Sequence, residues 1–188
     1  MASEVIEEAQ LEETETGLRP VTEGWFVVNV RDARWTRNEA FGEQCAFEGP
    51  WPQAWFRQLG VRLSVLQPGR PNCLYHRESQ QEDFLVLAGE CLLLVDGQER
   101  SLRAWDFVHC PPNTEHVFVG AGEGPCVILM VGARSEDEGL FFPSSDLARR
   151  YGASAENATS SGEEAYAATG FPGSEAGRPD SWRELPWA

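Results

Sequence analysis

The sequence of 188 residues predicts an all-β fold, either a barrel or a sandwich. Three observations lead to this prediction. Residues 61–133 hold a series of short apolar and β-branched runs, turn residues separate most of these runs, and no helical period interrupts them. With 41% hydrophobic residues, the chain has enough apolar side chains for one core, and its length suits one domain with extensions.

The expected strands follow one another at short intervals. The pair Asp96–Gly97 is typical of a tight hairpin, because both residues of such a turn adopt a positive φ. An earlier strand is expected at WFVVNV, which is aromatic and β-branched. The predicted strands cover residues 25–30, 61–67, 73–78, 83–87, 90–95, 98–103, 106–110, 115–119 and 126–131.

The composition divides the chain into three parts. Residues 1–24 are predicted to form an acidic N-terminal arm, and residues 25–134 the β domain, with a long loop rich in aromatic residues at 31–60. Residues 135–188 form a C-terminal extension with short helices expected at 146–151 and 163–168. Because this extension ends with Trp182, Leu185 and Trp187, we expect it to pack on the barrel or on a partner subunit.

The charge argues against several classes of partner. The formal net charge is −15, whereas binding to nucleic acid or to an anionic membrane requires clustered Lys and Arg. No apolar run approaches the roughly 20 residues that span a bilayer, and the first residues lack the pattern of a secretory signal. The sequence therefore predicts a cytoplasmic protein that binds a small-molecule ligand. Its five cysteines include no CxxC pair, so most are expected to be buried hydrophobic residues.

Two of the three histidines lie where a metal site is expected. His76 and Glu78 are two residues apart in a predicted strand, so their side chains share a face. Glu82 follows across a short polar link, and His116 comes just after a Pro–Pro–Asn turn. A barrel directs such residues into one lumen, where two acids and two histidines would be costly to bury without a cation. His109 lies on the preceding strand, and we expect a structural role for it.

Two motifs resemble those of the cupin family. The run H-x-E-x3-E-x6-G from His76 to Gly89 is similar to the first cupin motif, which reads H-x-H, three or four residues, E, six residues and G. The run WDFVHCPPNTEH, which ends at His116, resembles the second motif, GD, four residues, then P-x-G-x-x-H. The resemblance covers about two fifths of the chain. It implies a jelly-roll type double-stranded β-helix, often a homodimer, that binds a divalent metal through His76, Glu82 and His116.

The chain departs from the family pattern at three positions. Glu78 stands in place of the second histidine ligand, Trp105 in place of a glycine, and Asn113 in place of the turn glycine. Asn tolerates left-handed backbone geometry, so the last change is mild. The predicted metal ligands are therefore His76, Glu78, Glu82 and His116. Two imidazoles with two carboxylates favour harder ions, and zinc, iron or manganese all remain open. If only three ligands engage, we expect Glu78 to stay outside and to act as a base beside the metal.

These features leave several functions open. The first is a metal-dependent enzyme that acts on a small polar molecule, of the sugar-phosphate isomerase or dioxygenase type. The others are a non-enzymatic module that binds a small ligand and a structural cupin. Work on a phosphosugar requires basic residues near the metal, and Arg62, Arg77 and Arg103 are the nearest in sequence. The sequence assigns neither a catalytic residue nor an organic cofactor.

Overall fold

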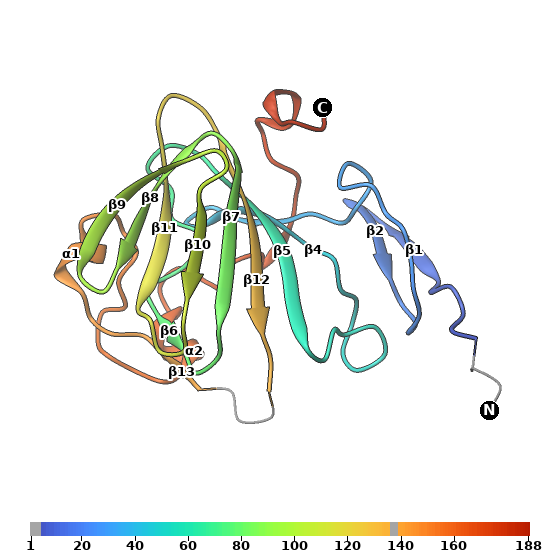
Figure 1. Cartoon of the computed structure of the whole chain (residues 1–188), viewed down its shortest axis with the longest axis horizontal. Coiled ribbons are helices and arrows are strands. Elements are labelled where there is room, and N and C mark those ends of the chain that lie inside the picture. The colour runs from blue at the N-terminus through green and yellow to red at the C-terminus, as the bar shows by residue number, and fades with distance from the viewer. Residues whose placement is uncertain (1–4, 136–138) are drawn as a thin grey trace.

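The computed structural model describes residues 5–135 and 139–188. Most of the regular structure is antiparallel β, and the few helices are short (Figure 1). The strands are β1 (Leu11–Thr14), β2 (Gly17–Pro20), β3 (Thr36–Asn38), β4 (Gly42–Ala46), β5 (Leu59–Leu66), β6 (Arg77–Glu78), β7 (Glu82–Ala88), β8 (Glu90–Val95), β9 (Gln98–Arg103), β10 (Phe107–Cys110), β11 (His116–Ala121), β12 (Cys126–Ala133), β13 (Leu140–Phe141) and β14 (Glu175–Ala176). The helices are α1 (Asp146–Arg149), α2 (Gly162–Ala165) and the 3-10 turn η1 (Trp182–Glu184).

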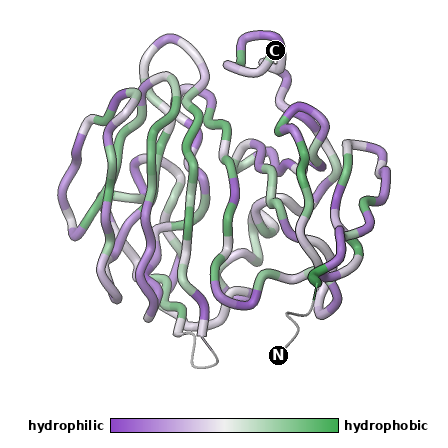
Figure 2. The backbone as a smooth tube through the Cα atoms, turned by 45° about the vertical axis from the view of Figure 1, so that its right-hand side comes forward, coloured by the Kyte–Doolittle hydropathy of each residue, from purple (hydrophilic) through white to green (hydrophobic). Residues whose placement is uncertain are grey.

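Two sheets form the barrel. The larger sheet has the strand order β10-β7-β12-β5-β4-β3-β14, and the smaller one has the order β11-β8-β9. The main core lies between them, since residues of both sheets form one buried cluster that includes Phe84, Leu93, Phe118 and Ile128. The strands in the middle of the barrel carry long hydrophobic stretches (Figure 2). The predicted all-β barrel is confirmed.

The hairpin and turn predictions agree with the backbone. Asp96 and Gly97 have φ values of 44° and 74°, as a tight hairpin between β8 and β9 requires. Asn113 has a φ of 69°, so it supplies the left-handed geometry expected at the turn before β11. Trp105 has a φ of 75°, which shows why a glycine suits that position.

The predicted strand at residues 25–30 is wrong. Trp25 makes an isolated bridge with Glu8, and no strand follows it within residues 26–30. Val28 and Val30 instead pack against the cluster around the buried Trp35. A high β-propensity does not provide a neighbouring strand edge to pair with, so these residues contribute to the core without joining a sheet.

The strand expected at residues 73–78 is also much shorter. Only Arg77 and Glu78 form β6, which pairs with β13 at the lower end of the barrel in Figure 1. Before it, Tyr75 donates its backbone N–H to Ala153 O at 2.6 Å, so the C-terminal extension occupies this edge. His76 pairs with His116 through an isolated bridge.

The segments outside the barrel strands are more regular than their composition predicts. Residues 11–20 form the hairpin β1–β2, and the aromatic loop at 31–60 contains β3 and β4, which extend the larger sheet. Helices α1 and α2 begin after Ser145 and Ser161, whose side chains accept a backbone N–H from the first turn. No helix within residues 5–135 and 139–188 has the length and apolar character needed to span a bilayer.

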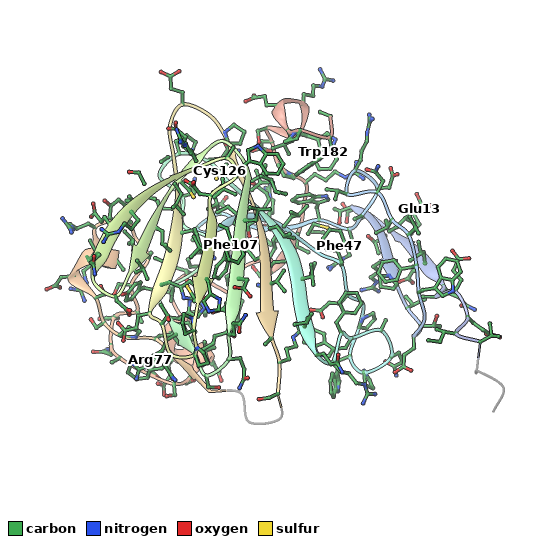
Figure 3. The ribbon with its side chains drawn as sticks, in the orientation of Figure 1. Glu13, Phe47, Arg77, Phe107, Cys126 and Trp182 are labelled. Atoms are coloured by element: carbon green, nitrogen blue, oxygen red, sulfur yellow. The ribbon has the colours of Figure 1, made fainter. Side chains whose placement is uncertain are left out.

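The end of the C-terminal extension packs on the barrel. The Trp182 and Trp187 rings have their centroids 5.6 and 5.5 Å from that of Trp35, and Leu185 is buried in the same cluster. Phe47 from the aromatic loop and Trp182 from the extension, both labelled in Figure 3, pack against this cluster although they are far apart in the sequence. The extension and the loop therefore share a second core on the outside of the larger sheet.

Candidate metal centre

His76 and His116 present matching ring nitrogens to the lumen. His76 Nδ1 lies 2.8 Å from Leu74 O, and His116 Nδ1 lies 3.0 Å from Thr114 O. A carbonyl oxygen only accepts, so in both rings Nδ1 carries the hydrogen and donates it. The Nε2 atom of each ring therefore keeps its lone pair, which is the arrangement of a histidine that binds a metal through Nε2.

Glu82 completes a group of three possible ligands. One ligand atom from each of His76, Glu82 and His116 lies within 4.8 Å of the others. Within this group, His116 Nε2 lies 3.4 Å from Glu82 Oε2. Ligand atoms about 2.1 Å from a common ion lie roughly 3 Å apart, so this spacing is of the right order for one metal ion.

Burial sets the protonation states of these three groups. Burial and the neighbouring His116 lower the pKa of His76 to about 3, and burial also lowers the pKa of His116. Both imidazoles are therefore neutral near pH 7, as metal ligation requires. Burial and the charge of Glu78 raise the pKa of Glu82 to about 8. A divalent ion would stabilise the charged form of Glu82 and accept both Nε2 lone pairs, so the three residues fit such an ion.

Glu78 lies beside this group. Its Oε1 is 3.8 Å from His76 Nε2, and its side chain is 34% exposed, against 13% for Glu82 and 2% for His116. It lines the same cavity as the three clustered residues. The structure thus brings together three of the four residues predicted from the sequence and places the fourth at the edge of the group.

His109 lies apart from this group of candidate ligands. It is on β10, and its Nδ1 is 2.7 Å from Asp83 Oδ1 in a pair that is exposed to solvent. Its neighbour Phe107, labelled in Figure 3, is 65% exposed on the same strand. Side chains two apart on a strand share a face, so His109 points to the outside of the barrel.

The three clustered residues lie in a cavity of about 370 Å³. A volume of this size suits a small ligand. Apolar walls come from Phe84, Met130 and Phe142, and polar atoms from other lining residues. The polar lining residues other than the candidate ligands include Gln44, Arg62, Ser64, Asn72, Arg134 and Tyr166.

Residues 62–132 match the family model described as the cupin domain. The chain contains a cupin domain. This agrees with the order of the two motifs and with the barrel, and it confirms the resemblance seen in the sequence. The match includes His76, Glu82 and His116, and it leaves out the N-terminal residues and the C-terminal extension.

Solved structures with the cupin fold are similar to this chain. One is a sugar phosphate isomerase of the cupin superfamily from Silicibacter pomeroyi, which is 22% identical and has a TM-score of 0.53. The match covers 64% of this chain and 83% of the length of that protein. An RmlC-like cupin from Shewanella frigidimarina is 14% identical, with 62% and 97% coverage and a TM-score of 0.50.

A candidate sugar phosphate isomerase from Acidithiobacillus ferrooxidans is also similar, at 22% identity and a TM-score of 0.46. The match covers 53% of this chain and 64% of the length of that protein. No curated protein matches the sequence at a significant level. At these identities the similarity to the solved structures concerns the fold.

The cupin domain does not form the cavity alone. Tyr166, Phe171 and Pro172 of the C-terminal extension line it as well. The hydroxyl of Tyr166 accepts the backbone N–H of Leu74 at 3.2 Å, which ties the extension to the segment just before His76. The sequence carries no motif that marks these residues, because their place depends on long-range packing.

Cys73 also lines the cavity, although an extended strand would turn it away from His76. Its Sγ lies 3.6 Å from His76 Nδ1, and the residue is buried. In a regular strand at 73–78 the two side chains would lie on opposite faces, because the residues are three apart. The chain is irregular before β6, so the alternation of side chains does not apply there. Burial raises the pKa of the Cys73 thiol far above its usual range, which makes it a neutral wall residue.

Proposed function

We propose that this protein is a metal-dependent cupin enzyme that acts on a small polar molecule held in the barrel cavity. The convergence of His76 Nε2, His116 Nε2 and the Glu82 carboxylate at one cavity supports this proposal. Their buried, neutral imidazoles and the single buried carboxyl group favour a divalent ion of the zinc, iron or manganese type. Such an ion, once bound, would polarise a carbonyl or hydroxyl group of the ligand.

Glu78 is proposed as the proton acceptor of the site. It lines the cavity next to His76, and it is more exposed than Glu82, so it can approach a ligand without leaving its strand. A carboxylate in this place is suited to remove a proton from a carbon or oxygen atom beside a polarised carbonyl. Proton transfer of this kind is isomerase chemistry, and the cupin from Silicibacter pomeroyi with a similar fold is a sugar phosphate isomerase.

Metal analysis tests the first part of the proposal. Protein purified from metal-supplemented medium and dialysed should hold about one divalent ion per chain when measured by inductively coupled plasma mass spectrometry. His116→Ala should lose most of it, because the buried His116 supplies one of the three clustered ligand atoms. His109→Ala is the matched control and should keep the ion, since His109 faces away from the lumen. Equal loss in both variants, or a metal-free wild-type protein, would contradict the proposal.

Exchange of substrate protons with solvent tests the second part. Metal-loaded protein in D₂O is incubated with a panel of small hydroxy-aldehydes, hydroxy-ketones and oxo acids, with and without phosphate groups, and NMR follows deuterium incorporation next to the carbonyl. We expect exchange with at least one class and its loss in Glu78→Gln at unchanged metal content. If no compound exchanges, the metal site belongs to a binding protein and the enzymatic proposal fails.

A further inference from the structure

Two positively charged side chains, Arg62 and Arg134, line the cavity of the metal centre. Arg134 is already neutralised. Its guanidinium contacts both Glu48 carboxylate oxygens, at 2.6 and 2.9 Å, and donates to Phe56 O at 2.6 Å. It also lies 3.7 Å from the centroid of the Trp55 ring. These contacts hold the aromatic loop against the barrel, so Arg134 has a structural role.

Arg62 differs from Arg134 in having no such partner. Within residues 5–135 and 139–188, no carboxylate lies within ion-pair distance of its guanidinium, and its side chain makes no hydrogen bond. Its positive charge nevertheless acts on buried groups around the cavity. These groups are Cys73, His76, Glu82 and Tyr166. The Arg62 charge is therefore directed at the ligand space and remains available to a ligand.

The strand register places Arg62 in a polar patch of the cavity wall. Gly60, Arg62 and Ser64 alternate along β5 and all line the cavity, so they share its inner face. Ser64 is 4% exposed. Its hydroxyl donates to Met130 Sδ at 3.4 Å, and a thioether sulfur is a weak acceptor. Gln44 on β4 is paired with Ser64 in register and lines the same cavity. An amide, a hydroxyl and a guanidinium therefore occupy one wall.

We propose that Arg62, supported by Ser64 and Gln44, binds an oxyanion of the ligand, which makes the substrate a small organic acid. The planar guanidinium offers two parallel N–H donors, the pattern that matches a carboxylate or a phosphate. This inference rests on the proposed function, because the opposite end of the ligand would lie at the metal centre.

The charge balance of the cavity favours a single negative charge. A divalent ion and Arg62 together carry one positive charge more than Glu78 and Glu82 remove. Arg62 is exposed and Glu78 is partly exposed, whereas Glu82 is largely buried, so water screens this excess charge only in part. A ligand that neutralises the remaining charge is therefore favoured. A carboxylate restores neutrality, whereas a phosphate dianion would reverse the sign. The carboxylate is thus the favoured oxyanion.

Calorimetric titration of the metal-loaded full-length protein tests the inference. The probes are glycolate, its neutral isostere glycolamide, and inorganic phosphate. We expect glycolate to bind at least about tenfold more tightly than glycolamide, since a charged hydrogen-bonded pair is worth that much. Arg62→Met should abolish the preference at unchanged metal content. Arg100→Met, which removes an equally long exposed side chain on β9, should keep it.

Each outcome separates this inference from the proposed function. An unchanged preference for glycolate in Arg62→Met, or no binding of either anion to wild-type protein, overturns the anion site. Tighter binding of phosphate than of glycolate, lost in Arg62→Met, would keep the site but replace the carboxylate by a phosphate ester. If the wild-type protein takes up no metal ion but still binds glycolate through Arg62, the anion site is retained and the proposed metal site is rejected. Should Arg62→Met fail to fold, Arg62→Lys replaces it. We then expect a preference for glycolate over glycolamide that lies between those of wild type and of a protein without the charge, because an ammonium group cannot form the bidentate hydrogen bonds of a guanidinium.

Discussion

His76 and His116 exchange two backbone hydrogen bonds, with N–O distances of 3.2 and 2.8 Å, and their ring centroids lie 4.9 Å apart. Directly opposed residues of an antiparallel pair carry their side chains on the same face. One pair of main-chain contacts therefore positions two of the three clustered side chains. A slip of one residue at this bridge would turn one imidazole out of the lumen. The fold and the candidate metal centre are specified together at this point.

Glu78 and Glu82 should respond differently to the loss of their charge. Glu82→Gln should lose most of the bound metal, because it removes one of the three buried groups. Glu78→Gln should keep the metal with an affinity lowered by no more than about tenfold, since Glu78 lies at the edge of the group. Competition with a fluorescent chelator measures both dissociation constants. If Glu78→Gln and Glu82→Gln lose the same amount of metal affinity, Glu78 is a full ligand, in agreement with the four ligands predicted from the sequence.

Glu82 should make the stability of the metal-free protein depend on pH. Because the pKa of Glu82 is raised to about 8 by burial, the folded protein retains a proton that the unfolded chain releases near pH 4.5. The unfolded state thus binds fewer protons between about pH 5 and pH 8, and the free energy of unfolding falls as the pH rises through this range. In EDTA, urea denaturation should show a smaller fall for Glu82→Gln than for wild type. Glu123→Gln, on an exposed turn, is the control and should follow wild type. Parallel profiles for wild type and Glu82→Gln would contradict this prediction.

Trp105 should be replaceable by glycine with a gain in stability. Its φ is 75° and its side chain is 74% exposed, so it combines an unfavourable backbone geometry with little burial. We expect Trp105→Gly to raise the free energy of unfolding by about 0.5–1 kcal/mol. Trp105→Ala removes the same ring and keeps the Cβ atom, so it should show no such gain. Urea denaturation midpoints at constant m-value check this, and a glycine variant less stable than the alanine variant would disprove it.

The barrel strands could be predicted closely because local signals determine them. The strand predicted at 90–95 corresponds to β8, and that predicted at 98–103 to β9, since the two-residue Asp96–Gly97 turn fixes their register. The strand predicted at 25–30 failed because its β-propensity is local, while a strand requires a partner edge that the sequence pattern does not reveal.

The candidate site was predictable in part for a similar reason. His76, Glu82 and His116 belong to motifs whose spacing survives in the sequence, and the structure groups them. In the sequence, Arg62 is only one of three basic residues near the metal motifs. Its difference from Arg77 lies in the ion pairs that the fold provides. Arg77 pairs with Glu115 at 2.9 Å, whereas Arg62 faces the cavity. Pairing of this kind depends on residues far apart in the chain.

Tyr166, Phe171 and Pro172 have a consequence for how such a protein can change over time. They shape the ligand space from a part of the chain that lies outside residues 62–132. Replacements there can alter which molecules are accepted while the donor atoms of the barrel stay in place. A descendant with a new C-terminal segment would keep these donor atoms and present a different cavity wall. The segment at 162–176, more than the barrel, is the place where two proteins of this type would be told apart.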